Sequence, residues 1–296
     1  MATAPIAIVG PGAVGATVAA YLHAAGHRLL LCGHTPRAQI ELRPDDADPI
    51  IVPGPVHIDP GQVTGPVGLV ILAVKTTQID AAAGWLAKLC DADTVVCVMQ
   101  NGVEQVERVA PHCPTSTVLP GIIWFGAETQ PDGWVRLRGT PRLALPVGPA
   151  AESVAAPLRD AGCTVDLDPD FTTAAWRKLL VNAVAGLMVL SGRRAGMFRR
   201  DDVAALARAY AGECVAVARA EGARLGDEVI EDVVGLFARG PADMGTSMLA
   251  DREAHRALEW EVRNAVITVR ARRHGLPTPI GDVLVPLLAA DSDGPG

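Results

Sequence analysis

The first thirty residues constrain the fold most strongly. A short apolar run at residues 6–9 leads directly into a glycine-rich segment at 10–15, which is followed by an alanine-rich stretch and a second apolar run at 29–31. This order predicts a strand, a tight turn, a helix and a parallel second strand. In such a unit the first glycine makes the turn, the second lets the backbone approach a pyrophosphate, and the third lets helix and strand pack closely.

The glycine-rich segment predicts a dinucleotide site rather than a plain structural turn, because a strand precedes it and a helix follows it. The phosphates are expected at the helix N-terminus, where unpaired N–H groups and the helix dipole favour negative charge. The loop residues expected to contact the dinucleotide are Gly10, Pro11, Gly12, Ala13, Val14 and Gly15.

The end of the second predicted strand indicates which dinucleotide binds. A site for NAD usually carries Asp or Glu there, on the ribose 2′-hydroxyl. This chain has no carboxylate between residue 32 and Glu41, and it offers donors at His34, Thr35 and Arg37 instead. A carboxylate would repel a 2′-phosphate, whereas these donors would bind it, so we expect NADP rather than NAD. The alternative is that the three residues form an ordinary polar loop.

Composition limits the class of protein. A chain of 296 residues with 49% apolar and 20% charged residues fits two globular domains. Its net charge of −7 argues against nucleic acid or a membrane surface as a partner. The six cysteines are dispersed without a paired motif, which favours reduced thiols in a cytoplasmic protein and predicts no metal site. The N-terminus lacks the basic region of a signal peptide, and no apolar run is long enough for a membrane helix.

Apolar runs alternate with helical segments in the first half of the chain. This alternation predicts an α/β fold, a Rossmann-type doubly wound parallel sheet. Residues 44–66 are expected to form loops and short edge strands. Further strands of the same sheet are expected at 69–74, 94–99, 118–123 and 134–137, with helices at 79–89 and 103–109.

The second half is helical in pattern. Amphipathic spacing appears at 173–191, 201–222, 227–238 and 247–274. We therefore expect a dinucleotide-binding domain at 1–168 and an all-helical domain at 169–296. Residues 291–296 are expected to form a disordered tail.

Polar residues stand out at two kinds of place. Lys75 and Asn101 follow predicted parallel strands, and ligands bind at the carboxyl ends of such strands. Lys178 and Asn182 are four residues apart, so they share one face of an otherwise apolar helix. A desolvated lysine has a lowered pKa and suits proton transfer. The alternative is that Lys178 extends its charge to the surface.

Five segments and one single residue, taken together, resemble the ketopantoate reductase (2-dehydropantoate 2-reductase) family over nearly the whole chain. They are GPGAVG at 10–15, AVK at 73–75, QNG at 100–102, WRKLLVN at 176–182, TSMLAD at 246–251, and Glu259 eight positions after Asp251. The resemblance implies reduction of 2-oxopantoate to D-pantoate with NADPH, a step in pantothenate and coenzyme A synthesis. It also implies a Rossmann domain, a helical domain and an active site in the cleft between them.

The resemblance also implies roles for individual residues. It makes Lys178 the general acid, with Glu259 in hydrogen-bonding support around the substrate. Asn101 would lie beside the nicotinamide and the substrate. Asn182 and Ser247 would bind substrate hydroxyl or carboxylate groups.

The same resemblance makes Lys75 a ligand of the adenosine 2′-phosphate. The family often carries an arginine at the end of the second strand, where this chain has His34. Arg37 or Thr35 is therefore expected to share that task.

One position departs from the family pattern. A second asparagine, four residues after the first, would fall at Gly186. It commonly holds the terminal hydroxyl of the substrate. A glycine is expected to leave room there without a hydrogen bond, which predicts tolerance of 2-oxo acids that lack this hydroxyl and leaves the exact 2-oxo acid open.

Two alternatives remain from the sequence. The chain could reduce another small or branched 2-oxo acid, or it could be a non-catalytic NADP sensor. A sensor has no need of a proton donor, so the set Lys178, Asn182 and Glu259 argues against it. The helical half could bury an apolar face in a homodimer or expose it, and its sequence does not decide between the two.

Overall fold

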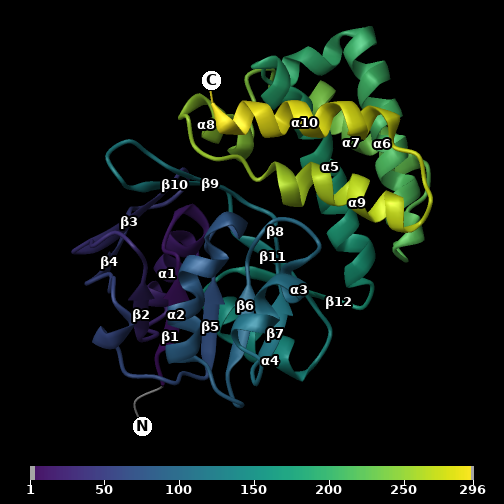
Figure 1. Cartoon of the computed structure of the whole chain (residues 1–296). Coiled ribbons are helices and arrows are strands. Elements are labelled where there is room, and N and C mark those ends of the chain that lie inside the picture. Colours follow the sequence, from purple (N-terminus) through teal and green to yellow (C-terminus); the bar gives the residue numbers. More distant parts are fainter. Residues whose placement is uncertain (1–3, 295–296) are drawn as a thin grey trace. The chain divides into compact units, whose positions relative to one another are not determined.

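Five parallel strands form the central sheet of the N-terminal half, in the order β2-β1-β5-β6-β7 (Figure 1). The structure, a computed structural model, describes residues 4–294. The strands of this sheet are β1 (Ile6–Val9), β2 (Leu29–Cys32), β5 (Leu69–Leu72), β6 (Val95–Val98) and β7 (Thr117–Pro120). The strand order reverses direction between β1 and β5, and a crevice for a ligand forms at such a point.

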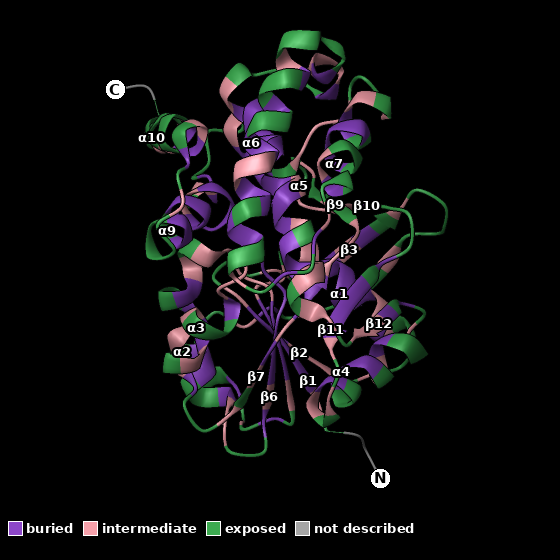
Figure 2. Ribbon diagram, turned by 90° about the vertical axis from the view of Figure 1, so that its right-hand side faces the viewer, coloured by how far each residue is buried: buried purple, intermediate pink, exposed green. Residues whose placement is uncertain are grey.

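Helices cover both faces of this sheet (Figure 2). They are α1 (Ala13–Ala24), α2 (Ile79–Leu89), α3 (Gln105–Val109) and α4 (Pro149–Asp160). Ile6 and Ile8 pack in one core with α1 and α4, whereas Ala7 and Val9 pack in the other with α2. Because successive strand residues point to opposite faces and both faces are buried, the strand is apolar throughout. The predicted α/β class is confirmed.

Two smaller sheets complete this half of the chain. They comprise β3 (Gln39–Pro44), β4 (Ile50–Pro53), β9 (Gly126–Thr129) and β10 (Val135–Arg138) in one, and β8 (Ile122–Ile123), β11 (Arg142–Pro146) and β12 (Thr164–Asp168) in the other. The prediction that 118–123 and 134–137 all belong to the central sheet is therefore wrong. Only β7 joins it, while β8 pairs with β11 and β10 pairs with β3 and β9. Apolar periodicity identifies a strand but not the strand it pairs with.

The C-terminal half is helical, and the two compact units divide between Phe171 and Thr172. Its helices are α5 (Phe171–Ser191), α6 (Asp201–Ala220), α7 (Glu228–Arg239), α8 (Ser247–Glu253), α9 (Val266–Arg273) and α10 (Pro279–Asp293). Short 3₁₀ turns occupy Pro60–Gln62, Thr76–Gln78, Ala110–His112 and Ala195–Arg199. Helix α5 is apolar enough to cross a membrane by length and composition alone, but 67% of an apolar 18-residue stretch of it is buried, as in a core helix (Figure 2).

Two expectations for this half are wrong. Residues 247–274 do not form one helix, because α8 ends at Glu253 and the chain becomes helical again only at Trp260. A π-helical turn, Glu261–Ala265, then leads into α9. The expected tail from residue 291 is instead the end of α10, with residues 295–296 outside the described part of the chain.

Tertiary contacts explain why this end of the chain is helical. The Arg252 guanidinium donates to the Asp291 carboxylate at 2.7 Å, and the Leu258 N–H donates to Ser292 Oγ at 3.0 Å. Both partners are distant in sequence, so a composition-based prediction of a tail does not detect them.

Candidate active site

The glycine loop between β1 and α1 has the geometry of a phosphate cradle. Gly10 has φ of +87°, and a Cβ on it would lie 2.8 Å from the Val74 backbone nitrogen. A Cβ on Gly15 would collide with the Gly10 carbonyl oxygen, so neither position accepts a side chain. A Cβ on Gly12 would meet nothing within 4 Å, which leaves open space at the first turn of α1. That turn carries no acidic residue, so the loop fits the pyrophosphate of a dinucleotide.

Strand register brings three loops to one edge of the central sheet. Val9 is paired with Leu72, and Leu72 with Val98, so the loops that follow these residues are neighbours. Lys75 and Asn101 lie in the second and third of these loops, and both are partly buried. The structure thus brings the glycine loop, Lys75 and Asn101 to the same edge.

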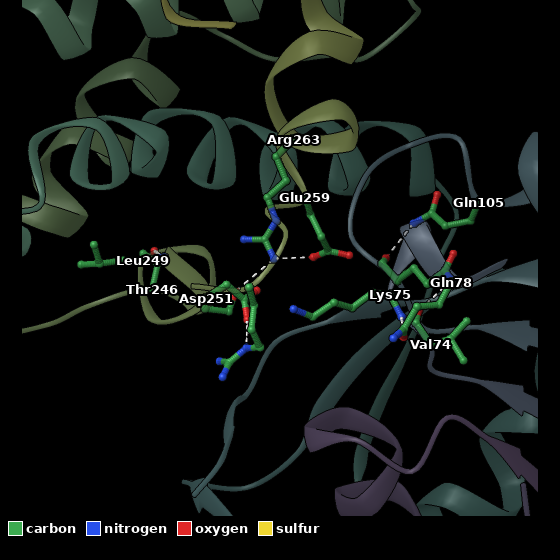
Figure 3. A network of polar contacts seen from close by, with 12 residues as sticks. Val74, Lys75, Gln78, Gln105, Thr246, Leu249, Asp251, Glu259 and Arg263 are labelled. Carbon is green, nitrogen blue, oxygen red and sulfur yellow. Dashed lines mark hydrogen bonds and ion pairs between the residues drawn. The ribbon is translucent and has the colours of Figure 1, made fainter. Parts of the chain in front are cut away.

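Gln100 connects the loops after β5 and β6, and two further glutamines brace one loop each. Gln100 Nε2 donates to the Val74 carbonyl at 2.8 Å, and Gln105 Nε2 donates to the Gln100 carbonyl at 3.1 Å. The Lys75 N–H donates to Gln78 Oε1 at 3.2 Å (Figure 3). The loop that carries Lys75 and the loop that carries Asn101 are therefore held together by a side chain as well as by the sheet. In the sequence Gln100 stands out only as part of the QNG segment, because its link to Val74 depends on the fold.

The loop after β2 carries the other expected cofactor ligands. His34 and Thr35 are exposed, and Thr35 Oγ1 lies 2.9 Å from His34 Nδ1. Arg37 is partly buried, and its Nη1 donates to the Gly133 carbonyl at 3.4 Å. His34 and Thr35 thus lie together, while Arg37 contacts a different loop.

Lys178 lies on the core helix of the helical unit. Burial first, and then the positive charge of Arg263, lower the pKa of Lys178 to about 8. Asn182 follows one turn later on α5 and is buried. The expected lowering of the pKa of this lysine is therefore present. A pKa of about 8 is close to the value that suits general acid–base catalysis at neutral pH.

A second polar cluster of the helical unit joins Ser247, Glu259 and Arg263. Arg263 Nη2 donates to Ser247 Oγ at 3.0 Å. The same nitrogen donates to Glu259 Oε2 at 2.9 Å (Figure 3). Ser247 is the first residue of α8, whose N-cap Thr246 accepts a hydrogen bond from the Leu249 N–H. Sequence analysis missed Arg263, although its place four residues after Glu259 was a usable signal.

Gly186 does not provide the open space that was expected. A Cβ there would lie 2.9 Å from Asn264 Nδ2 and 3.4 Å from Leu288 Cδ1. Each step of four residues along an α-helix rotates the side chain by about 40°. Gly186 is therefore turned by about 80° from Lys178, into the packing against the π-helical turn and α10. The prediction that Gly186 leaves room for the far end of a substrate is wrong.

A substitution at this position should now affect stability. We expect Gly186→Asn to lower the free energy of unfolding by about 1–3 kcal/mol, because the added atoms overpack the contact with Asn264 and Leu288. Urea denaturation measures the change, with Gly212→Asn as the control, since a Cβ on Gly212 of α6 meets nothing within 4 Å. Equal losses in both variants would contradict this account and indicate a general effect of asparagine in a helix.

Known proteins resemble this chain over both its N-terminal and its C-terminal half. The family model described as "Ketopantoate reductase PanE/ApbA" matches residues 6–150, and the model of its C-terminal part matches residues 170–291. A 2-dehydropantoate 2-reductase of Mycobacterium tuberculosis is 71% identical over 98% of this chain and 99% of its own. One from Caulobacter vibrioides is 33% identical over 96% and 98%.

Solved structures have the same fold. A dimeric ketopantoate reductase from Staphylococcus aureus superposes with a TM-score of 0.88 at 28% identity, covering 99% of this chain and 100% of its own. A D-mandelate dehydrogenase with NADH reaches 0.87 at 23% identity over 98% of each chain, a likeness of fold alone. With family models across both halves and a relative 71% identical over nearly its whole length, this chain belongs to the ketopantoate reductase family.

Proposed function

We propose that this chain reduces 2-dehydropantoate to D-pantoate in pantothenate biosynthesis, with NADPH as reductant and Lys178 as proton donor. The observation that carries the chemistry is the partly buried Lys178, whose pKa is lowered to about 8. The substrate follows from the 71% identity with the M. tuberculosis 2-dehydropantoate 2-reductase over nearly the full chain.

The chain's own residues divide the chemical work. A nicotinamide held at this edge of the sheet would supply the hydride for the 2-carbonyl carbon of the substrate. Lys178, as an ammonium, stabilises the charge that grows on the carbonyl oxygen and donates its proton there. Asn101, Asn182 and Ser247 bind and orient the substrate, with Glu259 supporting them. A positioned general acid contributes about 10²–10⁴ in rate.

The glycine loop and the loops after β2 and β5 would bind the dinucleotide. The pyrophosphate would lie against residues 10–15, and the 2′-phosphate would be bound by His34, Thr35, Arg37 and Lys75. The fold does not decide the choice of cofactor, because the D-mandelate dehydrogenase of the same fold carries NADH. The proposal of NADPH rests on these donors and on the missing carboxylate after β2.

We expect NADPH to bind at least about 10-fold more tightly than NADH, because charge-assisted hydrogen bonds to the 2′-phosphate contribute about 1.5–3 kcal/mol each. Fluorescence titration of both cofactors measures the ratio, and Lys75→Ala should reduce it, with Lys88→Ala on the exposed side of α2 as the matched control. Equal dissociation constants for the two cofactors would show that the donors are merely a polar loop.

A panel of 2-oxo acids tests the choice of substrate, with the oxidation of NADPH followed by its absorbance at 340 nm. We expect the highest kcat/KM with 2-dehydropantoate. A higher value with another small or branched 2-oxo acid would favour the first alternative. Binding of NADPH without turnover of any acid would favour a sensor.

We further propose a homodimer in the cytoplasm. The S. aureus relative is described as dimeric, and all six cysteines of this chain are free thiols, five of them buried. Light scattering on the purified protein measures the mass, and a monomer at micromolar concentration would contradict the proposed dimer.

A further inference from the structure

Arg263 is a buried arginine that the resemblance leaves without a role. Its side chain is 4% exposed, and that of its partner Glu259 is 7% exposed. A buried ion pair gains little over well-packed apolar residues, because both charges lose their hydration. The Arg263 Nε also has no hydrogen-bond partner among residues 4–294, which adds a further cost. Stability is therefore a poor reason for an arginine at this position.

The contacts of Arg263 join two elements of the helical unit. One nitrogen, Nη2, donates both to Ser247 Oγ at the start of α8 and to Glu259 Oε2 just before the π-helical turn. Figure 3 shows the contact with Glu259. A guanidinium has five N–H donors and no acceptor. Ser247 must therefore accept from Arg263, and its own O–H hydrogen is left to donate elsewhere. A hydroxyl whose oxygen accepts from a cation is a stronger donor to an anion.

We propose that Arg263 is a positioning residue for the reduction, holding the Ser247 hydroxyl as a hydrogen-bond donor to the substrate carboxylate and fixing the Glu259 carboxylate beside it. The inference rests on the proposed function in that the substrate is a 2-oxo acid. It does not depend on which 2-oxo acid this is, because all of them carry the same carboxylate.

The charge of Arg263 has a second effect, on Lys178. Burial is the larger cause of the lowered pKa of Lys178, and the Arg263 charge is the next. Glu259 is paired with the same guanidinium, whereas Asn182 and Ser247 carry no charge. Removing the Arg263 charge removes its repulsion, which favours the ammonium form of Lys178. Loss of Arg263 therefore raises the pKa of Lys178.

The test compares three single variants of the full-length enzyme. Arg263→Met should raise the KM for the 2-oxo acid by about 10-fold or more, because one charge-assisted hydrogen bond contributes that much affinity. It should also move the alkaline limb of the kcat profile to higher pH. Arg263→Lys restores the charge without the fork-shaped donor set, so its alkaline limb should stay in place while KM rises. Arg270→Met is the control, because Arg270 is another buried arginine of this unit, paired with Glu221 at 3.5 Å.

A double-mutant cycle shows whether Arg263 acts through Ser247. We expect Ser247→Ala to raise KM, and Arg263→Met to add little to KM once Ser247 is alanine. Arg263→Met with unchanged KM and an unmoved alkaline limb would overturn the proposal, and so would fully additive effects in the cycle. If Arg263→Met does not fold, an unchanged KM in Arg263→Lys overturns it equally. Failure of the proposed function gives a different result, which is binding of NADPH by the wild-type protein without turnover of any 2-oxo acid.

Discussion

Replacing Lys178 by alanine is expected to lower kcat by at least about 100-fold while the dissociation constant for NADPH stays nearly unchanged. The reason is that a general acid acts mainly in the transition state, where charge grows on the carbonyl oxygen. Cofactor binding depends instead on the glycine loop and on the loops after β2 and β5. Steady-state kinetics with 2-dehydropantoate and fluorescence titration with NADPH measure the two quantities separately.

Two further variants sharpen this test. Lys88→Ala removes an exposed lysine from the last turn of α2 and should leave kcat unchanged. Lys178→Arg keeps the positive charge but holds its proton far more tightly, so it should bind the substrate and turn over slowly. Near-normal turnover of Lys178→Ala would reject Lys178 as the proton donor.

The rate of the wild-type enzyme is expected to fall about tenfold per pH unit above pH 8. The sign follows from the role of the lysine, since only the ammonium form donates a proton. With a pKa of about 8, Lys178 is protonated at neutral pH and loses its proton about two and a half pH units earlier than its usual value of 10.5 allows. Single-turnover measurements between pH 7 and 10 should show this alkaline limb directly.

Controls separate titration of Lys178 from other effects of alkaline pH. Activity should recover after a brief exposure to pH 10 and return to pH 7, which rules out unfolding. Lys178→Arg should lack the limb, because a guanidinium stays charged over this range. A flat wild-type profile in single turnover would assign the proton to another donor, since product release does not limit that measurement.

Local sequence determined most elements of the N-terminal half. The helix expected at 79–89 is α2 (Ile79–Leu89), and the strand expected at 6–9 is β1 (Ile6–Val9). Both follow from periodicity, and β1 also from the glycines that come directly after it; these signals depend on neighbouring residues alone. The same reasoning identified Lys75 and Asn101 as candidate ligands, because parallel strands bring the ends of β5 and β6 to one edge of the sheet.

Only tertiary structure decided the features that depend on partners distant in sequence. It decided that β10 pairs with β3 and β9, that α10 continues to Asp293, and that Gly186 packs against Asn264 and Leu288. It also decided that Arg263 reaches Ser247, which lies 16 residues away in the sequence. The physical reason is common to all four. Periodicity reports which residues are buried, but which buried or polar groups meet depends on how whole elements pack.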